Sequence, residues 1–429
     1  MSRGMKKTLA VLGVLAAAVF VSLLLLAPGP APAPGRGNLD ELVSLPYLAW
    51  SEQTVSARVA GVVAWDRDRA CPGYTLYADG SDYAWLLDLE GRPVHRWRFP
   101  DPGKGWDFAR LLDGGGIVAF HEGESLVRLD RESRVVWELP IGIHHEISPL
   151  DGGDFLVAVS NPHRLYRSRL VEFDSVRRIS SQGEPGEEWA TFTHFSELRN
   201  IHGPTALDAE TGAGGFARAL QRFYASHLRW GIYELDNLFR RCLGLEKYSY
   251  YHLNSAQALP RTELGRRDER FRAGNWLICL RNVNLVLAVD PRTGKIVWEW
   301  GADVLDWPHM PRMLENGRIL VFDNGYHRGF SRILEIDPVS GRTVWSYLAD
   351  PPQAFSSPTR GSCQRLPNGN TLICESDRGR IFEVDPAGAT VWEFYNPKIE
   401  DGRRGLIYRA LRLPPERVEG WLSPPPPAP

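Results

Sequence analysis

The most regular pattern in this 429-residue chain is an alternating apolar strand that ends in an Asp and is followed by a turn and a Trp. Such alternation indicates a β-strand with one buried face. Where copies follow each other directly, their Trp residues are 40 (97 to 137) or 47 (298 to 345) positions apart. That period is typical of a four-stranded propeller blade. The five copies run from Asp88 to Trp97, Asp130 to Trp137, Asp290 to Trp298, Asp337 to Trp345 and Asp385 to Trp392.

A second repeat occupies the other half of each unit and contains a Leu, a turn and a short apolar strand. In a propeller the first strand of each blade lines the central channel, so residues at one position of that strand converge near the axis. Three of the six residues at this position are histidines, which makes the channel mouth the candidate site. The six residues are Asp107, His145, His252, His309, Gly361 and Tyr408.

The two ends of the repeat predict how the ring closes. The first Asp-to-Trp half has no inner strand before it, and the last inner strand, Tyr408 to Leu413, has no Asp-to-Trp half after it. Joining them makes one blade from both termini and hides its edge strands. The sequence therefore predicts an all-β fold, a six-bladed β-propeller over residues 38–422.

The third blade lacks a clean Trp signature, because Leu170 to Asp174 is followed by two arginines. A helical insertion is expected at about residues 180–249, since apolar residues recur there at spacings of three and four. The clearest helical segments are 216–228 and 232–241. Two interpretations stay open, a lid over the channel mouth and a packing cap or docking surface for a protein partner.

The N-terminus predicts the compartment. Residues 8–27 are uncharged and follow Arg3, Lys6 and Lys7. Twenty such residues span a hydrocarbon core of roughly 30 Å, and a cleavable signal usually has a shorter apolar region. Residues 1–27 are therefore expected to be a single-pass inner-membrane anchor, with a cleaved signal as the alternative. The basic flank stays in the cytoplasm, so the propeller lies in the periplasm or extracytoplasmic space.

Residues 28–37 read as a Pro-rich linker, and residues 423–429 as a disordered tail. A net charge of -2 argues against nucleic acid as the main partner. The five cysteines form no disulfide framework. Cys279 and Cys374 fall in apolar strands as small core residues, and a bridge between Cys71 and Cys242 stays open.

Several segments, taken in order, resemble the arylsulfotransferase family. Those proteins are six-bladed propellers of the bacterial periplasm that move sulfate between phenols without a nucleotide sulfate donor. The resemblance covers roughly Gly73 to Pro415, apart from the insertion. It implies transfer of a sulfuryl group from an aryl sulfate to a phenolic or other hydroxyl acceptor, with no cofactor and no metal. The segments are His145-Glu-Ile, His252-Leu-Asn-Ser, Leu280-Arg-Asn-Val-Asn, His309 with its Asn-Gly strand, Phe322-Asp-Asn-Gly, Gln364-Arg-Leu-Pro-Asn-Gly and Tyr408-Arg-Ala-Leu-Arg.

The resemblance also implies roles for individual residues. His309 corresponds to the nucleophile that forms a sulfohistidine, and the family's His-x-Asn pair matches His252 and Asn254. Arg281 matches an arginine on the next strand. A guanidinium fork and imidazoles suit a sulfuryl group, whose oxygens stay charged throughout. His252 would protonate the leaving phenolate and then deprotonate the acceptor.

Four further residues complete the candidate site. His145 matches the family's early catalytic histidine, and His144 is the alternative if the strand register differs by one. Arg360 would add positive charge at the mouth or form a surface ion pair, and Tyr408 would contact the substrate. Each histidine has a plainer interpretation as a channel-lining group bonded to a backbone carbonyl, and Asn254 as a turn cap.

Two observations favour other interpretations. Pro308 and Pro311 flank His309, where the family has a Gln before the histidine and small or polar residues after it, and they restrict the local backbone. The propeller would then be a non-catalytic module that binds an anionic ligand or an envelope protein. A quinoprotein dehydrogenase, suggested by the Trp repeat alone, is disfavoured by six blades in place of the usual eight and by the lack of an acidic calcium site.

Overall fold

The computed structural model describes residues 42, 50–54, 59–101, 105–167, 169–208 and 247–422. Strands dominate these residues and the helices are short, so the expected all-β class is confirmed. The chain divides into two compact units. The larger comprises residues 46–160, 174–195 and 251–429, and the smaller comprises residues 1–45, 161–173 and 196–250.

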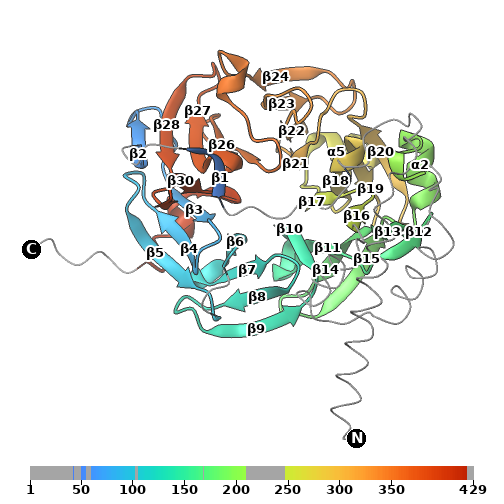
Figure 1. Ribbon diagram of the computed structural model, residues 1–429, viewed down its shortest axis with the longest axis horizontal. Coiled ribbons are helices and arrows are strands. Elements are labelled where there is room, and N and C mark those ends of the chain that lie inside the picture. Colours follow the sequence, from blue (N-terminus) through green and yellow to red (C-terminus); the bar gives the residue numbers. More distant parts are fainter. Residues whose placement is uncertain are drawn as a thin grey trace, which may run out of the picture. The chain divides into compact units, whose positions relative to one another are not determined.

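The larger unit contains six sheets with four consecutive antiparallel strands each (Figure 1). The first three have the orders β31(Arg409–Leu413)-β3(Tyr74–Ala78)-β4(Tyr83–Leu87)-β5(Pro93–Arg98), β6(Phe108–Leu111)-β7(Ile117–His121)-β8(Ser125–Leu129)-β9(Val135–Pro140) and β10(Ile143–Pro149)-β11(Phe155–Ser160)-β14(Asp174–Ile179)-β15(Pro185–Ala190). The other three are β17(Leu253–Ala258)-β18(Trp276–Leu280)-β19(Leu285–Val289)-β20(Ile296–Trp300), β21(His309–Met313)-β22(Ile319–Asp323)-β23(Arg332–Ile336)-β24(Thr343–Tyr347) and β25(Ser362–Arg365)-β26(Thr371–Glu375)-β27(Arg380–Val384)-β28(Thr390–Tyr395). A fifth strand, β2(Gly61–Trp65), adds to β28. A small sheet joins β1(Trp50–Thr54), β30(Arg403–Gly405) and β29(Ile399–Glu400), and a short helix, α5(Glu263–Arg267), follows β17.

The innermost strands connect the six sheets in a closed cycle. Strand β6 contacts β3 of the first sheet and β10 of the third, β10 contacts β17, β17 contacts β21, and β21 contacts β25. The cycle closes where β25 contacts β31. Figure 1 shows the sheets arranged around this common centre. The six positions expected to converge therefore begin strands that do face one centre.

The first sheet is built from both termini, as the repeat predicts. Strand β31 pairs antiparallel with β3 in a continuous register from Tyr74–Leu413 to Ala78–Arg409. This pairing gives β3 a partner on each side, because β4 occupies its other edge. The first and last elements of the cycle are thus hydrogen-bonded to each other.

A Trp on the fourth strand of every sheet, counted from the centre, joins that sheet to the next one. In each case the indole Nε1 donates a hydrogen bond of 2.9 or 3.0 Å to a backbone carbonyl of the neighbouring sheet. Five of the six are the repeat residues, which explains why the Trp recurs once per unit. The six pairs are Trp97 with Gly115, Trp137 with Ser181, Trp189 with Gly294, Trp298 with Pro338, Trp345 with Pro386 and Trp392 with Leu89.

The third sheet differs from the sequence prediction. Residues 185–190, which the sequence placed inside the helical insertion, form the outer strand β15 and supply the sixth Trp, Trp189. Five of these six residues are polar, small or Pro and only Trp189 is buried, so no alternation is visible in the sequence. Leu170 to Glu172 belong to β13(Arg169–Glu172), outside this sheet. The unit that interrupts the repeat therefore takes residues from two places, 161–173 and 196–250.

Within the smaller unit, β12(Arg164–Tyr166) pairs with β13, and β13 pairs in parallel with β16(Lys247–Ser249). The carboxylate of Asp208 accepts hydrogen bonds from the hydroxyls of Tyr166 (2.5 Å) and Tyr250 (2.6 Å). The described helix α2(Phe195–His202) belongs mostly to this unit. The expected helices at 216–228 and 232–241 lie outside the described residues.

Three predicted segments also lie outside the described residues: the anchor at 1–27, the linker at 28–37 and the tail at 423–429. Among the residues that are described, no helix has the length and apolar character needed to cross a membrane. Cys71, Cys279, Cys363 and Cys374 are buried free thiols, and Cys242 is not among the described residues.

Candidate functional site

The three innermost strands that carry the histidines share a distortion. Each contains a shift of register against its neighbour, between His144 and Ile147 in β10, between Leu253 and Ser255 in β17, and between His309 and Arg312 in β21. The other three innermost strands pair in regular register. A bulge of this kind bends a strand and re-aims its side chains, so these three strands alone turn their histidines toward the centre.

The backbone at these bulges is strained. His145, His252 and Met310 adopt left-handed conformations, with φ angles of 60°, 50° and 51°. Such a conformation costs roughly 1–3 kcal/mol for a residue with a side chain and tends to occur at functional sites. Pro311 also lies in a bulge, where the ladder requires no N–H donor from it. The proline that seemed unfavourable in the sequence is therefore accommodated by the distortion.

His145 and His252 form a direct imidazole pair. Their Nε2 atoms lie 2.7 Å apart, so one nitrogen carries the proton and the other accepts it. On the other side of the ring, Nδ1 of His145 contacts the Tyr408 hydroxyl and lies 3.4 Å from the Glu122 carboxylate. Burial lowers the pKa of His145 well below its ordinary value, and the neighbouring histidines and Arg409 lower it further.

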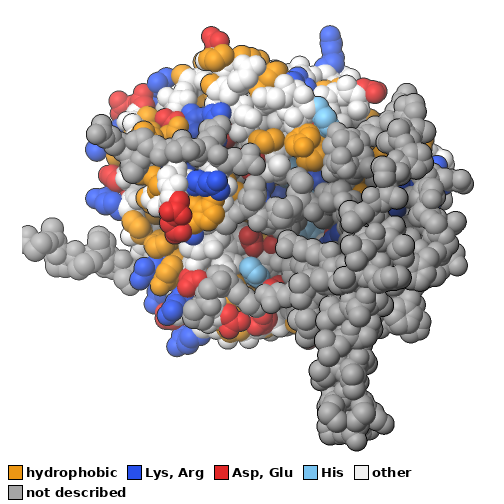
Figure 2. Space-filling view, viewed as in Figure 1, with side chains coloured by type: hydrophobic (Ala, Val, Ile, Leu, Met, Phe, Trp, Pro, Cys, Tyr) orange, Lys and Arg blue, Asp and Glu red, His pale blue; other side chains and the backbone are white. Residues whose placement is uncertain are grey.

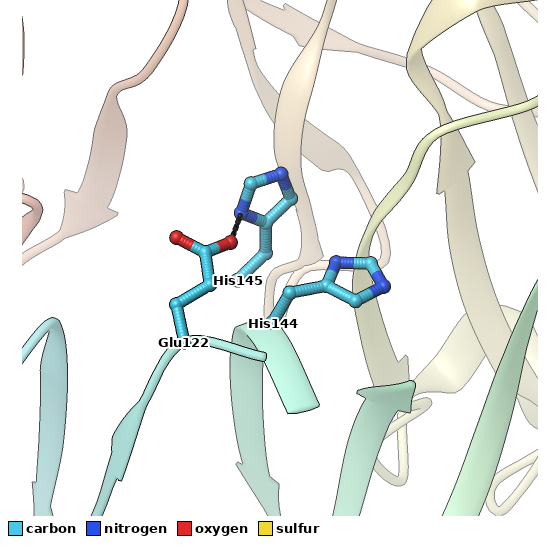
Figure 3. Close-up of side chains that lie close together, drawn as sticks. All are labelled: Glu122, His144 and His145. Atoms are coloured by element: carbon cyan, nitrogen blue, oxygen red, sulfur yellow. Dashed lines mark ion pairs between the residues drawn. The ribbon is translucent and has the colours of Figure 1, made fainter. Parts of the chain in front are cut away.

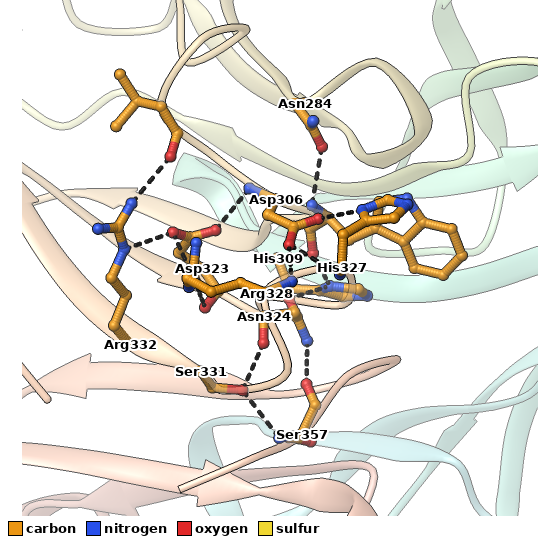
Figure 4. Close-up of polar contacts among 12 residues, drawn as sticks. Asn284, Asp306, His309, Asp323, Asn324, His327, Arg328, Ser331, Arg332 and Ser357 are labelled. Atoms are coloured by element: carbon orange, nitrogen blue, oxygen red, sulfur yellow. Dashed lines mark hydrogen bonds and ion pairs between the residues drawn. The ribbon is translucent and has the colours of Figure 1, made fainter. Parts of the chain in front are cut away.

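His309 is held in one tautomer. Its Nδ1 lies 2.8 Å from Oδ1 of Asn324 and 3.3 Å from the carbonyl oxygen of Trp307, both of which are acceptors (Figure 4). The orientation of the Asn324 amide is fixed, because its Nδ2 donates to the carbonyls of Ser357 (2.6 Å) and Arg360 (2.7 Å). Nδ1 of His309 must therefore carry the proton, which leaves a lone pair on Nε2.

Nε2 of His309 is buried and has no hydrogen-bond partner among the described residues. Leaving a buried polar atom in this state costs about 1–3 kcal/mol, so it calls for an explanation, of which a catalytic role is one. Burial, with Arg281 and Arg409 nearby, lowers the pKa of His309 to about 3. At neutral pH this nitrogen is an unprotonated nucleophile.

Arg281 is buried beside the histidines at the start of the short 3-10 helix η6(Arg281–Val283). Its guanidinium carbon lies 4.1 Å from the ring centre of Trp307, which in turn stacks on Tyr326 with ring centres 4.0 Å apart. Asn284, at the end of η6, accepts a hydrogen bond of 2.8 Å from the Trp307 N–H. Trp307 thus connects Arg281 with the segment that carries His309.

One cluster was not predicted from the sequence. The buried carboxylate of Glu146 pairs with Arg312, with Arg409 at 2.7 Å and with Arg110 at 3.4 Å. These four residues come from β10, β21, β31 and β6. Burial lowers the pKa of Arg110 to about 10, and the three guanidinium groups hold the pKa of Glu146 below its ordinary value despite its burial.

The remaining predicted site residues, Asn254, His144 and Arg360, have different surroundings. Asn254 does not cap a turn: its Nδ2 donates to the Pro308 carbonyl (2.7 Å), and its buried Oδ1 has no partner among the described residues. His144 is buried with Nε2 3.3 Å from Asp174. Arg360 lies 3.4 Å from Asp377 and 5.8 Å above the Tyr408 ring, so it approaches the site through Tyr408.

Two residues that the sequence did not single out, Asn324 and Glu122, therefore touch the central histidines. Asn324 lies within the segment Phe322-Asp-Asn-Gly that carried part of the family resemblance, so a signal for it was present. Glu122 follows β7 and has no counterpart in either repeat.

On the face drawn in Figure 2, acidic and histidine side chains are visible near the middle, and basic and acidic side chains alternate at the left edge.

Comparisons with known proteins bear on the same region. Residues 244–397 match the model of the arylsulfotransferase (ASST) family, so the resemblance is confirmed over this part of the chain. The matched part includes His252, Asn254, Arg281 and His309. No curated protein matches the chain in a sequence comparison.

Among solved structures, the chain is similar to a protein of unknown function from Bacteroides caccae, with 15% identity, 79% of this chain and 98% of that chain covered, and a TM-score of 0.49. It is also similar to an inactive variant of virginiamycin B lyase from Staphylococcus aureus, with 11% identity, coverage of 79% and 88%, and a TM-score of 0.42. A third is the Cps50 (Swd1) β-propeller domain of Myceliophteria thermophila, with 10% identity, coverage of 81% and 90%, and a TM-score of 0.41.

Proposed function

We propose that this protein transfers a sulfuryl group from an aryl sulfate to a phenolic or other hydroxyl acceptor, with His309 as the nucleophile. The observation that carries the proposal is the state of His309. Asn324 fixes the proton on Nδ1, and the buried Nε2 is left without a partner among the described residues. The family match over residues 244–397 supports arylsulfotransferase-like chemistry at this residue.

In the first step the Nε2 lone pair attacks the sulfur atom of the donor. The N–S bond forms while the bond from sulfur to the aryl oxygen breaks, and the electron pair leaves with that oxygen as phenolate. His252, in its imidazolium form and hydrogen-bonded through Nε2 to Nε2 of His145, then protonates the phenolate as the general acid and is left as a neutral imidazole. The products are a neutral phenol and a sulfohistidine at His309.

In the second step an acceptor hydroxyl takes the place of the phenol. Its oxygen attacks the sulfur atom, its proton returns to the imidazole pair through His252, and the S–N electron pair returns to Nε2. Asn324 keeps the Nδ1 proton in place throughout, because its amide is held by two carbonyls. The histidine is regenerated without a cofactor, and the order of events is ping-pong.

Positive charge supports the binding of the sulfate oxygens. Arg281 is buried next to the histidines, and the cluster around Glu146 sets three guanidinium groups against one carboxylate. In a site shielded from water such an excess favours an anionic group and the charge that develops in the transition state. Asn254 contributes by holding the carbonyl of Pro308, next to the nucleophile.

We also propose the architecture and location in which this chemistry occurs. The six sheets are the blades of a six-bladed β-propeller whose termini close one blade. Residues 8–27 anchor it in the inner membrane with a single pass, so the propeller lies in the periplasm or extracytoplasmic space. The absence of charge in residues 8–27 and the basic residues before them support this location. The inserted segment between the third and fourth sheets would dock a protein partner or act as a lid.

The test is turnover of a chromogenic aryl sulfate by the purified full-length chain in detergent, with and without a phenol acceptor. We expect acceptor-dependent phenol release, loss of at least ~10³-fold in kcat for His309→Ala, and a mass increase of one sulfuryl group on His309 when the acceptor is omitted. His327→Ala is the matched control, since His327 is half-exposed and pairs with Asp306. Turnover that survives in His309→Ala contradicts the nucleophile.

A second candidate is a module that binds an anionic ligand without transferring a group. The cluster of Arg110, Arg312 and Arg409 around Glu146 favours it, because this charge excess attracts an anion whether or not His309 reacts. Tight binding of an aryl sulfate with no phenol release and no sulfuryl adduct would support this function instead.

A further inference from the structure

We propose that Glu122, His144 and His145 form a binding site for a divalent transition-metal ion, with zinc as the best match. One ligand atom from each of the three residues lies within 4.8 Å of the other two. Figure 3 shows the carboxylate of Glu122 against the ring of His145, with the ring of His144 beside them. This site goes beyond the proposed sulfuryl transfer, which requires no metal.

The distortion of β10 creates this arrangement. Successive side chains of a regular strand point to opposite faces, so two adjacent histidines would be kept apart. Here the register shifts between His144 and Ile147, and the backbone of His145 is left-handed with a φ of 60°. The two rings consequently have centres only 5.0 Å apart and stand at 82° to each other. Two neighbouring residues are thereby directed to one place.

The donor set suits zinc. Two imidazole nitrogens and one carboxylate oxygen are the three protein ligands of many catalytic zinc sites, which keep a fourth position open. Oε1 of Glu122 lies 3.4 Å from Nδ1 of His145. Two ligands of a tetrahedral zinc ion with bonds of about 2.0–2.1 Å are separated by ~3.3 Å, so this pair already has the required spacing.

The residues around the trio support the same interpretation. Nε2 of His144 lies 3.3 Å from Asp174, which is almost fully buried and accepts a 2.9 Å hydrogen bond from the Leu253 N–H. A buried carboxylate behind a histidine is the usual means of orienting a metal ligand. The Tyr408 hydroxyl lies 3.4 Å from Oε1 of Glu122 and contacts Nδ1 of His145 directly, so it must move away from that nitrogen when an ion binds there.

A metal at this place would also control the histidine pair. With Nδ1 of His145 bound to the ion, its proton must reside on Nε2, which lies 2.7 Å from Nε2 of His252. His145 would then donate to His252, so zinc at this place would oppose the general-acid role proposed for His252. The ion would set which histidine of the pair holds the proton and would not itself contact the sulfur atom.

The experiment measures metal directly, so its outcome is independent of sulfotransferase activity. The purified full-length chain is stripped with a chelator, titrated with Zn²⁺ alone in competition with a chromogenic chelator, and examined by elemental analysis. We expect one equivalent for the wild type, and weakening of at least ~10-fold for Glu122→Gln and His144→Gln. Asp174→Asn should weaken binding by about 10–100-fold, as loss of an orienting carboxylate does.

His327→Gln is the matched control, because His327 also lies beside a carboxylate, 2.6 Å from Asp306, but is half-exposed and away from the trio. The proposal is overturned if the wild type takes up far less than one equivalent, or if Glu122→Gln and His144→Gln bind zinc as tightly as the wild type. Should a variant lose its native near-ultraviolet circular dichroism, X-ray absorption of the zinc-loaded wild type decides. Two imidazole ligands support the site, and a spectrum without histidine scattering refutes it.

Discussion

The side chain of Asn324 determines what His309 is able to do. By accepting from Nδ1 while donating to two backbone carbonyls, it leaves Nε2 as the basic nitrogen of the ring. A histidine without such a partner would divide its population between two tautomers and two ring orientations. The proposed nucleophile therefore depends on two residues, although only His309 would form the bond to sulfur.

This environment predicts an unusual pH dependence. An ordinary histidine protonates near pH 6.5, but burial and two nearby arginines lower the pKa of His309 to about 3, and burial also lowers that of His145. A lowered pKa keeps the nucleophile unprotonated as the pH falls, so activity is retained until the pH approaches that value. We expect kcat/KM for aryl sulfate to show no loss between pH 7 and about pH 5.

The measurement is a kcat/KM profile under conditions in which circular dichroism shows the chain to be folded. An acid limb with a midpoint near pH 6.5 would contradict the assignment, because it would mean that His309 titrates like an exposed imidazole.

For single residues, the sequence predicted which histidines share a position in the repeat, but not their tautomers or their hydrogen-bond partners. The shared position of His145, His252 and His309 in the repeat follows from the alternation of a strand, and the structure brings these three together with Tyr408. The tautomer of His309 depends on a residue of the adjacent strand segment. The contacts of Glu122 and Glu146 are made between separate sheets. No local sequence pattern encodes how those sheets face one another.

At the scale of elements, the Trp residue of each outer strand is the repeated joint between neighbouring sheets. The indole contributes both packing and a directed hydrogen bond to the next sheet's turn. These joints differ in burial: Trp392 is fully buried, whereas Trp345 is partly exposed. Their energetic contributions should differ accordingly, because a buried carbonyl that loses its donor cannot turn to water.

We therefore expect Trp392→Phe to lower the free energy of unfolding by about 1–3 kcal/mol, and Trp345→Phe by less than about 1 kcal/mol. Phe retains most of the ring but removes the N–H that donates to Leu89 or to Pro386. Urea titrations followed by far-ultraviolet circular dichroism provide the comparison. Equal losses for the two variants would show that the hydrogen bond contributes little and that packing alone makes the joint.

The sequence identified the Trp residues of five of these six joints, because they recur in a local pattern, and it predicted the sheet formed by both termini from the two incomplete ends of the repeat. The sixth was missed because β15 needs only one buried residue, Trp189, and its other positions face solvent or the strand edge. The interruption was seen, but its first part at 161–173 was not. Part of this segment, Leu170 to Glu172, reads like a strand of the neighbouring sheet, and its pairing with β16 distinguishes it.

At the scale of the whole molecule, the cluster around Glu146 ties together parts of the chain that are far apart in sequence. Arg110 is 36 residues away, Arg312 is 166 and Arg409 is 263. The innermost strands of four different sheets thus meet at one carboxylate. Arg409 is almost fully buried, and the carboxylate of Glu146 at 2.7 Å compensates its charge.

We expect Glu146→Ala to destabilise the fold by about 3–5 kcal/mol, because removing one partner of a buried ion pair leaves uncompensated charge in a medium of low polarity. Here three guanidinium groups would face one another, so the loss should be relieved at high salt, where a small anion can replace the carboxylate. The free energy of unfolding in urea, measured at low and high concentrations of sodium chloride, tests both parts.

Glu188→Ala is the matched control, since Glu188 pairs with Arg177 at 2.9 Å and both side chains are about a third exposed. An exposed pair of this kind contributes at most about 1 kcal/mol, and salt should reduce even that. A loss for Glu146→Ala no larger than that of the control would mean that the arginines find other acceptors, and that the ring is held by its strands and Trp joints alone. A large loss that salt relieves would show instead that this centre both binds the sheets together and attracts anions, the property on which the proposed sulfate binding beside His309 depends.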